Sequence, residues 1–139
     1  AAGSETFTVD NYAKAVALDP SNPALRLDFG SVFYQLATTT QDEKERVGFY
    51  SRAITELQMA IQLKPDYTNA YYNLAKVYES AKDYDNAYLN MQKTLTYLGS
   101  NNSEFGRIST ELEAIKSKLK TPTQTSPDTI PDNQLEITQ

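Results

Sequence analysis

The sequence predicts an all-α protein, an α-α superhelix built from stacked pairs of helices. Apolar residues recur at helical spacing along almost the whole chain. Clusters of Pro, Asp, Asn and Lys interrupt this periodicity, most clearly at residues 19–23 and 64–66. The period-two alternation and the Asn-Gly or Asp-Gly turns that mark β-hairpins are lacking. Together these features favour helices joined by short turns.

Composition excludes several classes of function. The 139 residues contain neither cysteine nor histidine, so disulfides, thiolate or imidazole metal sites and histidine-based catalytic triads are excluded. The 13 basic and 18 acidic residues give a net charge of −5, which argues against a nucleic-acid partner. No apolar run approaches the roughly 20 residues that span a bilayer, so no membrane insertion by this segment is expected. We expect a protein that is not an enzyme and that needs no cofactor.

The first half of the chain predicts three helices, over residues 7–18, 24–37 and 41–63. Thr40 and Glu43 have the spacing of a capping box at the start of the third helix. One continuous apolar stripe follows on that helix, formed by Val47, Tyr50, Ile54, Leu57 and Ile61. Gly48 costs a helix about 1 kcal/mol, so whether residues 41–52 are helix or loop stays open.

The second half predicts helices over residues 68–81, 86–98 and 103–118, the last one capped by Ser103. Residues 121–139 differ in composition, because they hold three of the six prolines and few apolar side chains. Such a segment buries too little apolar surface to offset the entropy of ordering it. We therefore expect a disordered tail there.

Two internal repeats are visible in the sequence. The pattern of Tyr71, Leu74 and Tyr78 recurs 34 residues later as Phe105, Ile108 and Leu112. An earlier recurrence, from residues 12–20 to residues 57–65, has a spacing of 45. The difference of eleven residues lies between Leu36 and Ala53 and equals about three helical turns, so it can lengthen a helix without rotating its buried face.

These patterns resemble the tetratricopeptide repeat (TPR), which reads W-x2-L-G-x2-Y, then A-x3-F-x2-A and a proline, within 34 residues. The central unit has Tyr71, Leu74, Ala75, Tyr78, Ala87 and Met91 at these places, and the preceding unit has Phe29, Gly30, Phe33, Ala53, Leu57, Ala60 and Pro65. The central unit departs from the pattern with Thr94 for the second Ala and Gly99 for the Pro. The resemblance covers about residues 8–119.

The resemblance implies a TPR-like solenoid of about two and a half repeats. Its parts are an incomplete repeat at 1–20, a repeat with the eleven-residue insertion at 21–66, a repeat at 67–100, a capping helix at 101–120 and the tail at 121–139. Because the first unit lacks its first helix and the chain begins without Met, we expect a piece cut from a longer protein.

The resemblance also implies a concave groove, lined by the first helix of each pair. The groove residues expected to contact a ligand are Tyr34, Tyr72, Asn73, Lys76 and Arg107. They suit a peptide segment that carries at least one acidic group. TPR domains that grip chaperone tails use two Lys, two Asn and one Arg. Asn73 and Arg107 match that clamp, but Leu27, Ser31 and Ser103 replace the other three, so a chaperone tail is not the expected ligand.

We thus expect a non-enzymatic interaction or assembly scaffold, in the cytoplasm or in an extracytoplasmic domain of a larger protein. An alternative is the soluble extracytoplasmic TPR portion of a bacterial membrane protein, such as an O-antigen ligase-like glycan enzyme. That alternative rests on an Asn- and Thr-rich surface and the incomplete first unit. The acidic clusters at residues 42–45 and 83–85 are interpreted as a helix N-terminus and a turn, and no metal site is expected.

The insertion adds one further expectation. Val47, Phe49 and Tyr50 lie on it, beyond the reach of ordinary neighbouring helices. If all three are exposed, they form an apolar patch that favours weak homodimerisation.

Overall fold

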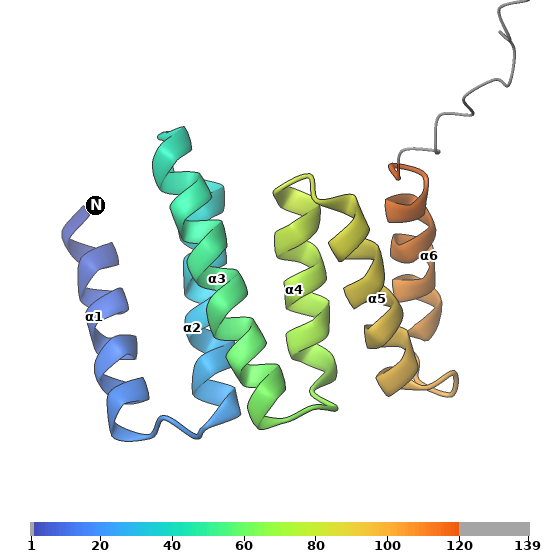
Figure 1. Cartoon of the computed structure of the whole chain (residues 1–139), viewed down its shortest axis with the longest axis horizontal. Helices are drawn as coiled ribbons and strands as arrows, with labels where there is room; N and C mark the ends of the chain where they lie inside the picture. Colours follow the sequence, from blue (N-terminus) through green and yellow to red (C-terminus); the bar gives the residue numbers. More distant parts are fainter. Residues whose placement is uncertain (1, 120–139) are drawn as a thin grey trace, which may run out of the picture.

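The computed structural model describes residues 2–119 and folds them into six helices without a strand. Figure 1 shows these helices standing side by side, each running opposite to the one before it. The all-α prediction is confirmed. The helices are α1 (Ala2–Leu18), α2 (Pro23–Thr39), α3 (Glu43–Leu63), α4 (Thr68–Ser80), α5 (Tyr84–Leu98) and α6 (Phe105–Lys116). The predicted tail, residues 121–139, lies outside the described residues.

Each helix packs mainly on its neighbours in sequence. The most extensive contacts join α2 to α3 and α4 to α5, and smaller ones join α1 to α2, α3 to α4 and α5 to α6. α2 also touches α4 directly. This pattern of local contacts is that of a solenoid, in which each helix pair buries its apolar face against the next pair.

The helix starts explain two differences from the sequence predictions. Asp42, not Thr40, caps α3, because its carboxylate accepts a hydrogen bond from the backbone N–H of Glu45. The Thr40 hydroxyl instead donates to the Glu45 side chain. Ser103 does not cap α6, which begins at Phe105 without a side-chain cap. α3 is one continuous helix from Glu43, so Gly48 does not break it and the insertion is helical from that residue onward.

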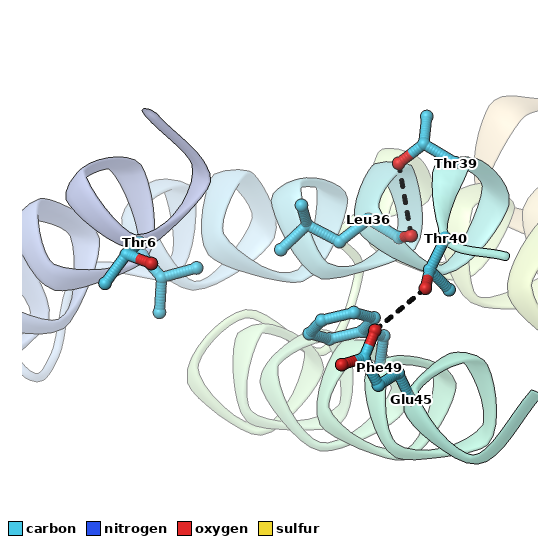
Figure 2. Close-up of a pocket in the computed structure, with 7 residues that line it drawn as sticks. Thr6, Leu36, Thr39, Thr40, Glu45 and Phe49 are labelled. Carbon is cyan, nitrogen blue, oxygen red and sulfur yellow. Dashed lines mark hydrogen bonds between the residues drawn. The ribbon is translucent and has the colours of Figure 1, made fainter. Parts of the chain in front are cut away.

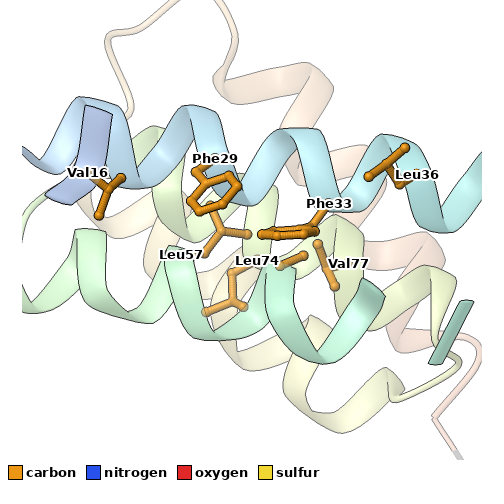
Figure 3. Packing of buried hydrophobic residues seen from close by; sticks show 8 residues of the cluster. Val16, Phe29, Phe33, Leu36, Leu57, Leu74 and Val77 are labelled. Carbon is orange, nitrogen blue, oxygen red and sulfur yellow. The ribbon is translucent and has the colours of Figure 1, made fainter. Parts of the chain in front are cut away.

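Two clusters of buried apolar residues form the core. Figure 3 shows the first, to which α1 contributes Val16, α2 contributes Phe29, Phe33 and Leu36, α3 contributes Leu57, and α4 contributes Leu74 and Val77. The second joins α4, α5 and α6 through Ala75, Ala87, Met91, Ile108 and Ile115. The small residues of the TPR pattern are buried, namely Gly30, Ala53, Ala60, Ala75 and Ala87. A Cβ added at Gly30 would lie only 2.8 Å from Cγ of Leu57.

The expected apolar patch on the insertion is wrong in two members. Phe49 points back into the α2–α3 contact, and its ring lies 6.4 Å from that of Phe33. Tyr50 is also half-buried and packs against the first core cluster, so of the three residues Val47, at 63%, is the exposed one. No helix among residues 2–119 is long and apolar enough to cross a membrane.

Candidate functional site

All five residues predicted for the groove lie on α2, α4 and α6. Tyr34 is on α2, Tyr72, Asn73 and Lys76 are on α4, and Arg107 is on α6. Residues 72 and 73 are each three or four residues from 76, so Lys76 lies beside both on α4, while Tyr72 contacts α6 and Asn73 contacts α2. We call this surface the α2–α4–α6 face. Hydrogen bonds between side chains connect its three helices, but they form two separate groups.

The first group joins α2 to α4. The Asn73 side-chain amide donates to Oγ of Ser31 at 3.1 Å, and the Ser31 hydroxyl donates to the backbone carbonyl of Leu27. The hydroxyls of Tyr34 and Ser80 are hydrogen-bonded at 2.9 Å. One of the two side-chain amide hydrogens of Asn73 therefore takes part in a hydrogen bond within the fold. Its side-chain carbonyl oxygen and its second amide hydrogen are available to bind a peptide backbone.

The second group joins α4 to α6 around Arg107. The guanidinium of Arg107 donates to Glu104 at 2.7 Å, to Glu111 and, at 3.2 Å, to the hydroxyl of Tyr72. It also lies over the Tyr72 ring, 5.5 Å from the ring centre. Tyr72 in turn donates to Glu111. These contacts fix the orientation of a guanidinium that is still about half exposed, with 51% of its side chain accessible.

Lys76 extends this second group along α4. Its ammonium lies 2.7 Å from Glu79 and 3.6 Å from Glu111, while Lys118 lies 2.8 Å from the other oxygen of Glu79. Burial alone would lower the pKa of Lys76, but the hydrogen bond and charge of Glu79 outweigh it, so the pKa is raised. Burial likewise acts to raise the pKa of Glu79, and the hydrogen bonds from Lys118 and Lys76 outweigh it and lower the pKa.

The structure thus brings Tyr72, Lys76 and Arg107 together around Glu111 and places Tyr34 and Asn73 at the other junction. The TPR resemblance also implies a groove position for Glu79, whereas Glu111 and Lys118 were not predicted to take part. The spacing of Arg107 and Glu111, four residues apart on one helix, was a signal for their pairing. The contacts of Lys118 and Tyr72 across helices depend on how α4 and α6 are aligned, which the sequence does not give.

Two recesses flank the projecting end of the α2–α3 hairpin. One, of about 410 Å³, lies against α1, and Figure 2 shows Phe49 and the hydrogen-bonded pair Thr40 and Glu45 at its wall. The other, of about 480 Å³, lies on the opposite side of α3 and is lined by Val47, Tyr50 and Ile54 on α3 and by residues 80–82 of the α4–α5 turn. We call it the α3–turn cleft. Across the described part of the chain no three acidic side chains gather as a metal site would require.

Comparisons with known proteins agree with this architecture. Residues 48–82 match the sequence model of the TPR repeat, and this range covers α3 from Gly48 onward, all of α4 and the start of the turn after it. No curated protein sequence matches the chain. The TPR resemblance inferred from the sequence is confirmed over this unit.

Several solved structures share the fold. The first TPR domain of Spaghetti (RPAP3), bound to the HSP90 peptide SRMEEVD, is 23% identical with a TM-score of 0.64, and the match covers 83% of this chain and 79% of that one. The TPR2B domain of yeast Sti1 in its complex with pHsp70 is 16% identical with a TM-score of 0.68, over 84% and 86%. The Sgt2 TPR domain from Aspergillus fumigatus is 19% identical with a TM-score of 0.65, over 96% and 82%. The chain therefore has the fold of a TPR domain.

Proposed function

We propose that this chain is a non-catalytic interaction scaffold that holds a peptide segment of another protein on its α2–α4–α6 face. The observation that carries the proposal is that α2, α4 and α6 contribute two aromatic rings, one amide and two cations, which form two hydrogen-bonded groups at the α2–α4 and α4–α6 junctions. Aromatic side chains contribute contact area at low entropic cost, and an amide bonds a peptide backbone as donor and acceptor. TPR domains of the same fold have been solved with HSP90 and Hsp70 peptides, which supports this use of the fold.

The chemistry of Arg107 indicates where an acidic group of the ligand would bind. Arg107 has two carboxylate partners, and Glu104 is the more exposed of them, with 54% of its side chain accessible against 26% for Glu111. An incoming carboxylate would replace Glu104, since an exposed ion pair contributes little stability. Glu111 and Tyr72 would keep the guanidinium in place during this exchange. The α2–α4–α6 face would then bind preferentially a peptide that has an Asp, a Glu or a free C-terminus.

The ligand is not expected to be a chaperone tail held by the five-residue clamp. Ser31 stands where that clamp has its first Asn, and its hydroxyl already receives the Asn73 amide. The second candidate, a soluble TPR portion of a membrane-bound glycan enzyme, rests on the Asn- and Thr-rich surface and the incomplete first unit, and it stays a hypothesis. It would add no catalytic group to this chain.

The experiment that tests the proposal is selection of binding peptides from a displayed library of short random sequences with free C-termini. Peptides enriched by the chain should carry an acidic group, and their affinity should fall by about 1–3 kcal/mol for the Asn73→Ala/Arg107→Ala variant. Leu89→Ala is the matched control, because Leu89 is 56% exposed on α5, away from the α2–α4–α6 face. Equal affinity of the double variant and the parent would overturn the proposal.

A further inference from the structure

We infer that the projecting end of the α2–α3 hairpin is a self-association surface, through which two copies of this chain pair about a two-fold axis. The surface lies on the α3–turn cleft and is separate from the α2–α4–α6 face proposed to bind peptides. It exists because the insertion lengthens α3, whereas α4 ends at Ser80. Figure 1 shows the N-terminal end of α3 projecting past the end of α4.

The cleft has an apolar wall, in which Val47 is exposed while Tyr50 and Ile54 are half-buried against the first core cluster. Val47, Tyr50 and Ile54 follow one another at spacings of three and four residues, so they lie on one side of α3. The opposite side of the same segment packs on α2 through Phe49. Val47 is one of the most exposed large apolar residues among those described, at 63%. An apolar stripe of this length beside a recess of about 480 Å³ is shaped to accept a second helix.

Charge complementarity selects a second copy as the occupant. Asp42 and Glu43 lie at the tip of the hairpin, and Lys82 lines the side of the cleft that the α4–α5 turn forms, while Glu43 and Arg46 line the side that α3 forms. Neither Glu43 nor Lys82 has an ion-pair partner among residues 2–119. If two α3 helices pack side by side in opposite directions, the tip of each hairpin reaches the α4–α5 turn of the other copy. Glu43 of each copy then meets Lys82 of its partner.

In the two-fold arrangement each contact occurs twice, once from each copy to the other, as in every isologous interface. Val47 and Tyr50 lie near the axis and bury each other, while the two pairs of Glu43 and Lys82 lie at the edges of the contact. Exposed ion pairs contribute little on their own, so most of the affinity comes from the apolar centre. Because only about two turns of α3 take part, the dimer is weak and the ion pairs set its specificity and salt dependence.

Sedimentation velocity of the whole chain, from micromolar concentration to about 1 mM, tests this inference. We expect a reversible monomer–dimer equilibrium that salt weakens and that Tyr50→Glu weakens at least tenfold. Leu89→Glu places the same charge on an exposed apolar position of α5 and should leave the equilibrium unchanged. Circular dichroism spectra of both variants should match that of the parent.

Exchange of the charges of Glu43 and Lys82 gives the most specific test of this interface. Glu43→Lys and Lys82→Glu should each weaken the dimer several-fold, and the double variant should recover it, because the exchanged charges attract again across the axis. A monomer at every concentration would overturn the inference, and so would equal weakening by Leu89→Glu. Dimerisation only after removal of residues 120–139 would identify that segment of the chain as the occupant of the cleft, which also overturns it.

Discussion

The contact between α2 and α3 at Gly30 predicts opposite effects for the same substitution at two glycines. At Gly30 an added Cβ would lie 2.8 Å from Cγ of Leu57 and 3.2 Å from the backbone oxygen of Ala53. Leu57 is fully buried and Ala53 presents backbone, so neither can retreat easily. At Gly48, in the second turn of α3, an added Cβ meets nothing within 4 Å. The added methyl group therefore overpacks the α2–α3 contact in Gly30→Ala but not in Gly48→Ala, and this is the main difference between the two variants.

The magnitude follows from two terms. Both substitutions gain about 1 kcal/mol of helix propensity. Gly30→Ala also has an overpacking cost of about 2 kcal/mol, so it should destabilise the chain by about 1 kcal/mol, while Gly48→Ala stabilises it by about 1 kcal/mol. For a domain of this size the two variants should melt about 8 °C apart. Thermal unfolding followed by circular dichroism measures this difference. If Gly30→Ala melts at or above Gly48→Ala, α2 and α3 do not approach as closely as described.

Three further predictions concern packing, charge and the C-terminal segment. Ala87→Leu should lower stability by about 1–3 kcal/mol in urea unfolding, because Ala87 is fully buried between α4 and α6; an unchanged midpoint would contradict the repeat register. Glu79→Gln should destabilise the chain at neutral pH. The difference from the parent should begin to shrink as the pH falls through about 4.5 and should disappear below the lowered pKa that Glu79 has in the folded chain, because the carboxylate stabilises the fold only while it is ionised. A difference that does not change between neutral and acidic pH would show that the charge of Glu79 is not what matters. Removal of residues 121–139 should leave the melting temperature unchanged, because their sequence contains few apolar residues, and a drop of several degrees would refute this.

The helices and their order could be predicted from the sequence because apolar periodicity and helix-breaking clusters are local signals. The stripe from Val47 to Ile61 correctly predicted that α3 is long, although Gly48 left its start open. The position of Phe49 was also within reach of the sequence. Two residues along a helix correspond to a rotation of about 200°, so Phe49 and Val47 must face nearly opposite sides.

The caps and the site were harder to predict for physical reasons. Thr40 and Asp42 are both good capping residues, and the choice between them depends on how the loop leaves α2. The five groove residues were placed by resemblance to the TPR pattern. The contacts of Glu111 with Tyr72 and Lys76, and of Lys118 with Glu79, depend on the alignment of α4 with α6. The packing of the second core cluster sets that alignment.

The most direct test of the proposed function is an NMR titration of the chain with a peptide selected from the displayed library. The Tyr50→Glu variant should serve as the sample, so that self-association through the α3–turn cleft does not contribute to the shifts. We predict that amide signals of Asn73 and Lys76 on α4 and of Arg107 on α6 shift, with the Asn73 side-chain amide among them, while Leu89 on α5 stays unchanged. Shifts confined to α3 and α5, with those of α4 and α6 unmoved, would contradict binding at the α2–α4–α6 face.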